Sequence, residues 1–127
     1  MVARREKVRA ENRAAVAYIV GRLLTGKHAS SVYDYARSVY VNFSGSVRTG
    51  HVQVFSYETS NYVSGSGSSS SLNLFDYAHG NHLHLKLAGN QFKGFDYGTG
   101  THFQGNVAGR GVQLFDYGEG QYFNYAI

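Results

Sequence analysis

Hydrophobic and polar residues alternate along most of this chain. The pattern is clearest near the end, where Val112 and Leu114 flank Gln113, a turn follows at Gly118-Glu119, and a second alternating run covers residues 121–127. Alternation with a period of two, interrupted by glycine-containing turns, predicts β-hairpins. The C-terminal part of the chain is therefore expected to form β-structure.

The hairpin pattern repeats about every twenty residues. Phe-Asp-Tyr occurs at 75–77, 95–97 and 115–117, and weaker copies, Phe55-Ser56-Tyr57 and Tyr33-Asp34-Tyr35, precede them. Five hairpins give ten antiparallel strands, and closing them into a ring removes the two exposed edges of an open sheet. We therefore predict a mainly β fold, a shallow ten-stranded barrel with pseudo-five-fold symmetry.

The turns themselves differ in sequence between copies. Glycine follows the central pair of turn residues in the last three copies, whereas Ala36 and Glu58 occupy the turns of the first two copies. Because glycine adopts positive φ at little cost, this difference predicts a turn type that is not uniform.

The pairing of strands within each hairpin follows from the rule that opposed residues share a face. Placing Phe115 opposite Tyr122 also places Leu114 opposite Phe123, which makes one face aliphatic and the other aromatic. In the other copies this register opposes Tyr33 with Tyr40, Phe55 with Tyr62, Phe75 with His82, and Phe95 with His102. We call these ten residues the aromatic belt. Alternation alone leaves open which face lies inside the barrel.

The first thirty residues have a different pattern. Apolar residues recur there at helical spacing, at Val8, Ala15, Ile19 and Leu23. The spacing predicts an amphipathic helix from about Ala3 to Leu24, ended by Gly26. A single domain is expected, with residues 1–30 as helix and linker and residues 31–127 as the barrel. We expect the helix across one mouth, although a ten-stranded interior also has room for the helix or a ligand.

Positive charge is concentrated in the N-terminal segment. Residues 1–27 carry a net charge of +5 and the remaining residues −1. The candidate contacts to an anionic partner are Arg4, Arg5, Lys7, Arg9 and Arg13. An anionic membrane surface fits a basic amphipathic helix, and nucleic acid is a less favoured partner. A solvated basic face on a docked helix is the interpretation that needs no partner.

Composition narrows the function classes further. The chain has no Cys, which excludes disulfides, thiolate zinc sites and cysteine nucleophiles. No run approaches the roughly 20 apolar residues of a spanning helix, and no signal-peptide pattern is evident. We therefore expect a cytoplasmic location, with a peripheral membrane position as the alternative.

Recurrent acidic and histidine residues raise the question of a metal site. Those aspartates are Asp34, Asp76, Asp96 and Asp116. One carboxylate per copy is too dispersed for a single cation, so capping of turn N–H groups is expected instead. His82, His84 and His102 share a face, but Tyr fills the slot of His82 and His102 in other copies, which favours aromatic packing. No metal, cofactor or catalytic residue is predicted, and we expect that the protein is not an enzyme.

The tandem hairpins over residues 31–127 resemble the β-flower proteins in architecture and repeat length, without a shared residue motif. That resemblance implies a small symmetric shallow barrel and carries no established activity. The aromatic-Asp-aromatic-x-x-Gly element also resembles the tyrosine-aspartate repeats of large toxin shells, although the usual Gly-Arg pair of those repeats is missing. Neither resemblance supplies functional residues.

Function is predicted from the aromatic belt. Aromatic rings beside amide side chains suit sugar rings or bases, so we predict a non-catalytic binding or interaction module for a small molecule, a protein or a glycan. A membrane-associated module acting through the basic helix and a self-assembling structural protein, or homo-oligomer, are the alternatives. Aromatic pairs that only fix the strand register would need no ligand at all.

Overall fold

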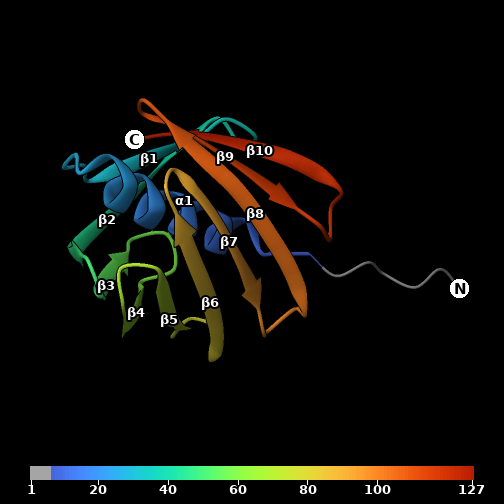
Figure 1. Cartoon of the computed structure of the whole chain (residues 1–127). Coiled ribbons are helices and arrows are strands. Elements are labelled where there is room, and N and C mark those ends of the chain that lie inside the picture. Colours follow the sequence, from blue (N-terminus) through green and yellow to red (C-terminus); the bar gives the residue numbers. More distant parts are fainter. Residues whose placement is uncertain (1–6) are drawn as a thin grey trace, which may run out of the picture.

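The computed structural model describes residues 7–127, and these form one α-helix and ten β-strands (Figure 1). The elements are α1 (Ala10–Thr25), β1 (Ser31–Asp34), β2 (Val39–Arg48), β3 (His51–Ser56), β4 (Asn61–Gly67), β5 (Ser71–Asp76), β6 (Asn81–Ala88), β7 (Gln91–Asp96), β8 (Thr101–Ala108), β9 (Gly111–Asp116) and β10 (Gln121–Ala126). Consecutive strands pair antiparallel, and β1 also pairs with β10, which closes the barrel. The predicted fold class is confirmed.

The register predicted within the hairpins is also confirmed. Phe115 lies opposite Tyr122 and Leu114 opposite Phe123, and the belt pairs of the other four hairpins are directly opposed as well. The aliphatic face lines the interior, where Val54, Leu74 and Leu114 have no exposed surface. The aromatic belt therefore lies on the outside of the barrel.

Helix α1 lies inside the barrel, so the expected position across one mouth is wrong. Every residue from Asn12 to Gly21 is buried, and Figure 1 shows the helix enclosed by the strands. The Tyr18 ring stacks on Phe43 of β2 with ring centroids 4.5 Å apart. The physical reason is that residues 14–21 carry no charged side chain, and a helix that is apolar on every face is stable only when it is surrounded.

The helix begins later than the sequence pattern predicts. It starts at Ala10, residues 7–9 precede it, and the predicted turn over residues 3–6 lies outside the described residues. Its end is as predicted, because Gly26 adopts a left-handed conformation with φ of 68°. Among the described residues, no helix has the length and apolar character that crossing a bilayer requires.

The hairpin turns share one backbone feature at the residue that ends each turn, and the predicted difference in turn type stays a prediction. Ser38 and Ser60 have φ of 55°, and Gly80, Gly100 and Gly120 have φ between 69° and 71°. All five positions are left-handed. The strands on both sides fix the path of the turn, and serine adopts it despite its Cβ.

Candidate functional site

Four buried aspartates surround one end of the barrel. They are Asp34, Asp76, Asp96 and Asp116, which we call the aspartate rim. Oδ1 of each aspartate accepts the backbone N–H of the residue two positions later, at 2.8 to 3.0 Å. The predicted capping role is confirmed. Within residues 7–127, no three His, Asp or Glu side chains are grouped so that they could hold a metal ion.

The second carboxylate oxygen of two rim aspartates anchors α1 and the residues before it. Oδ2 of Asp116 accepts the Val8 N–H and an Arg13 guanidinium N–H, both at 3.1 Å. Oδ2 of Asp76 accepts the Asn12 amide at 3.0 Å. The rim thus joins the turns of the barrel to the helix inside it.

Arg13 was predicted to contact an external anionic partner, and this is wrong. The residue is 6% exposed, and its guanidinium lies 3.7 Å from the centroid of the Phe123 ring besides its pairing with Asp116. A buried arginine needs a counter-charge, and Asp116 supplies it from the far end of the chain. Arg13 therefore belongs to the core.

The other basic candidates do not assemble into an outward surface on the described helix. Lys7 forms a 2.7 Å salt bridge with Glu119, and Arg9 is half-buried. Arg4 and Arg5 lie outside the described residues. The described part of the N-terminal segment is thus a structural element of the barrel.

Two ionisable groups near the rim are shifted by their surroundings. Arg37 donates to Asp34 and to Glu58 of the next hairpin, at 2.7 Å each. Burial alone would lower the pKa of Arg37, but these bonds outweigh burial and raise it. Burial raises the pKa of Tyr125 strongly, and the negative charge of Asp34 adds to that shift.

The aromatic belt is larger than the sequence interpretation proposed. Phe115 contacts its cross-strand partner Tyr122 and also Tyr117, with both pairs of ring centroids 4.9 Å apart. The same three-ring cluster recurs in every hairpin, through Tyr35, Tyr57, Tyr77, Tyr97 and Tyr117. These five flanking tyrosines were missed, although each lies two residues after a belt residue and so shares its face.

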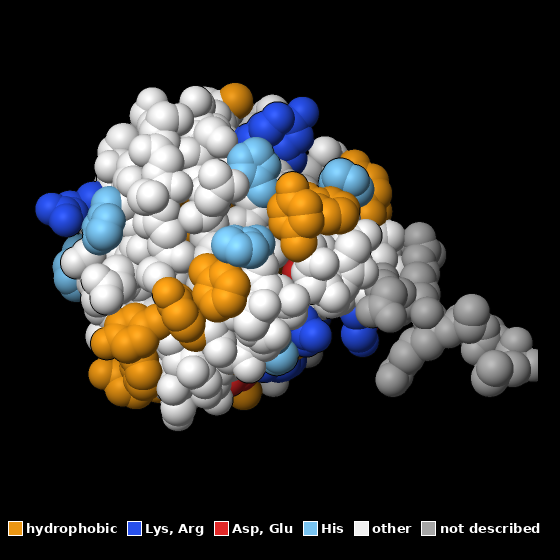
Figure 2. Space-filling model, turned by 90° about the horizontal axis from the view of Figure 1, so that it is seen from below, with side chains coloured by type: hydrophobic (Ala, Val, Ile, Leu, Met, Phe, Trp, Pro, Cys, Tyr) orange, Lys and Arg blue, Asp and Glu red, His pale blue; other side chains and the backbone are white. Residues whose placement is uncertain are grey.

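The clusters are exposed and separate from one another. Tyr40 is 70% exposed, and the flanking tyrosines are exposed as well. Figure 2 shows one side of the molecule, where groups of hydrophobic side chains alternate with histidines and no continuous apolar patch forms. The barrel therefore carries the same small aromatic surface five times around its circumference.

The outer surface is hollowed over β6, β7 and β8. One hollow, of about 750 Å³, reaches from Ser71 of β5 to Gln113 of β9 and the belt residue Tyr122. A neighbouring hollow, of about 820 Å³, contains the belt residues Phe95 and His102. We call the two together the outer hollow.

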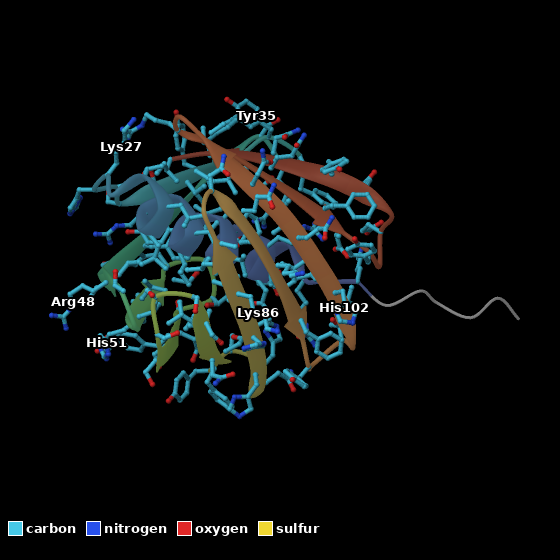
Figure 3. The ribbon with its side chains drawn as sticks, in the orientation of Figure 1. Lys27, Tyr35, Arg48, His51, Lys86 and His102 are labelled. Carbon is cyan, nitrogen blue, oxygen red and sulfur yellow. The ribbon has the colours of Figure 1, made fainter. Side chains whose placement is uncertain are left out.

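Two lysines stand where the two parts of the outer hollow meet. Lys86 lies opposite Lys93, Lys93 lies opposite Gln104, and all three residues line both parts. Figure 3 shows Lys86 on β6 and His102 on β8 on the same side of the barrel, with Tyr35 far from both. The sequence interpretation missed the lysine pair because it joins two different hairpins.

Histidine and amide side chains complete the outer hollow. His84 lies opposite Phe95, and its Nε2 is 3.0 Å from the Ser71 hydroxyl. Asn106 lies opposite Gln113 in the next row of outward residues. Rings, amides and amines thus meet on one face.

Comparisons of the chain with protein-family models, with curated proteins and with solved structures found no match.

Proposed function

We propose that the protein is a non-catalytic binding module that holds an oligosaccharide on the outside of its barrel. The observation that carries this proposal is the outward position of the aromatic belt beside the outer hollow. The described residues of α1 are buried inside the barrel, in the space where a ligand would otherwise be held. A ligand would therefore meet the outer surface.

The side chains of the outer hollow suit a sugar chemically. Tyr97 and Tyr122 present ring faces on which the C–H face of a sugar can stack, and their two-torsion side chains lose little entropy on binding. Gln104 and Asn106 offer both donors and acceptors to hydroxyl groups. Repetition of the ring cluster would add avidity for a polymeric ligand.

The buried helix and the exposed aromatic rings bear on the two alternative functions that the sequence predicted. The membrane-associated module depended on an outward helix, and α1 is buried in the barrel. Self-assembly through the exposed aromatic rings stays a prediction, which light scattering over a range of protein concentrations tests. The likeness to β-flower proteins and the cytoplasmic location also stay predictions.

The proposal is tested by isothermal titration of neutral and acidic oligosaccharides, cellohexaose and oligogalacturonate, into the full chain. The double variant Tyr97→Ala/Tyr122→Ala removes two rings of the outer hollow. Its matched control, Tyr35→Ala/Tyr57→Ala, removes equally exposed rings of other clusters, since all four tyrosines are 56 to 63% exposed. We expect the first variant to bind at least about tenfold more weakly and the control to bind nearly as the parent does.

Two results would contradict the proposal. If none of the oligosaccharides binds, the proposed function is wrong. Equal loss of affinity in both variants would mean that ligands do not prefer the outer hollow.

A further inference from the structure

The lysine pair in the outer hollow is electrostatically unfavourable in the free protein. Directly opposed residues on neighbouring strands have Cβ atoms about 4.5–5.5 Å apart, and like charges at such positions destabilise a sheet. Lys86 and Lys93 are opposed in this way and are both exposed. Within residues 7–127, neither lysine forms a salt bridge.

The pairing stands out against the composition of the barrel. Residues 28–127 contain five Lys and Arg residues and six Asp and Glu residues, yet two of the five cations meet here. No Asp or Glu is among the residues that line either part of the outer hollow. The outer hollow is thus a locally positive surface on a barrel of slightly negative net charge.

Neutral hydrogen-bonding groups surround the two amines. Gln104 lies directly opposite Lys93, and His84 and His102 both lie opposite Phe95 in the adjacent row. An anion placed between the lysines would relieve their repulsion and still have amide donors within the same surface.

We propose that the outer hollow binds an acidic oligosaccharide, with a carboxylate or sulfate group held between Lys86 and Lys93. This inference rests on the proposed function and names the ligand class. Two amines match a ligand with one or two charges at this point, whereas a nucleic acid would need a row of cations along its phosphates. The adjacent tyrosines and amides then contact the uncharged part of the sugar.

The test compares charged with uncharged forms of the same sugar polymer. Oligogalacturonate is titrated against its methyl ester, and dextran sulfate against dextran, which separates carboxylate from sulfate. In at least one pair, we expect the charged form to bind the full chain at least about tenfold more tightly than the uncharged form does. This preference should decrease as salt is added.

Two variants with equal loss of charge localise the effect. Lys86→Gln/Lys93→Gln should bind the acidic sugar at least about tenfold more weakly. Lys27→Gln/Arg48→Gln removes the same charge from residues outside the outer hollow, far from Lys86 in Figure 3, and should bind as the parent does. Without sugar, the first variant should also unfold at a slightly higher temperature, because the repulsion is gone.

The outcomes separate the inference from the proposed function. Equal binding of charged and uncharged sugars by the full chain overturns the inference while the binding function stands, and so does equal loss of affinity in both variants. Absence of binding by all the sugars overturns both. Binding of single-stranded oligodeoxynucleotide in preference to every acidic sugar would assign the lysine pair to a different ligand. The comparison on the parent chain is decisive even if a variant fails to fold.

Discussion

At the scale of single residues, the periodicity of the chain predicts well on which face of the sheet a residue lies. It predicts less well what surrounds the side chain of that residue. The opposed belt pairs follow from alternation alone, because register within a hairpin depends only on the turn and the face. The burial of Arg13 could not be predicted from the periodicity, because it depends on Asp116, which is 103 residues away in the sequence. The sequence alone does not reveal that a charged side chain is buried, because only the fold brings the counter-charge close to it.

The turn serines show a similar limit. Glycine ends the turn in only three of the five copies, yet the backbone is left-handed at all five positions, including Ser38 and Ser60. A non-glycine residue in this conformation costs roughly 1–2 kcal/mol. In the first copy, the two N–H groups that Asp34 caps help to offset that cost. Local propensity was overridden by the repeating sheet around the turn.

Tyr125 leads to a prediction about alkaline stability. Burial raises the pKa of Tyr125 above its usual 10.0, so the folded state holds this proton more tightly than the unfolded chain does. Its contribution to stability is therefore complete below pH 10 and decreases as the pH rises further. The free energy of unfolding, measured by urea titration, should be steady from neutral pH to about pH 9 and then decrease.

The variant Tyr125→Phe should show a shallower decrease above pH 10, because the buried hydroxyl is gone. Tyr40→Phe is the control, since it removes the same hydroxyl from a tyrosine that is 70% exposed. An identical alkaline decrease in the two variants would show that Tyr125 does not carry the effect.

At the scale of elements, the strands were more predictable than the helix. Twenty-residue repeats gave the ten strands, whereas the position of α1 depended on which space in the barrel remained to be filled. A signal was present in residues 14–21, which lack a charged residue on any face. The arginines near both ends of that run favoured a docked, half-exposed helix instead, and they masked this signal.

The anchoring of α1 gives a prediction that separates core from surface charges. Arg13→Met leaves the carboxylate of Asp116 buried without its cation and should lower the free energy of unfolding by about 3–5 kcal/mol. Lys7→Met breaks a largely exposed pair with Glu119 and should cost about 1 kcal/mol or less. Chemical denaturation of both variants measures the difference. Similar small losses in the two would place Arg13 at the surface.

At the scale of the whole molecule, closure could be predicted and the outer hollow could not. Closure follows from the need to pair two sheet edges, which holds for any ten-stranded array of this kind. The outer hollow arises from outward side chains on several hairpins, and alternation within one hairpin does not specify how it pairs with the next. Functional inference from repeats therefore located the aromatic belt, but not the pairing of Lys86 with Lys93 beside it.

The central claim is that α1 fills the barrel, which leaves the outer surface for the ligand that we propose. Native-state hydrogen exchange of the full chain, read by mass spectrometry, tests this most directly. We predict that the amides of residues 12–21 exchange as slowly as those of β8 and β9, which pack against the helix. Exchange of residues 12–21 as fast as that of the exposed turn at residues 68–70, with the strands still protected, would show that the helix leaves the barrel and would contradict the account.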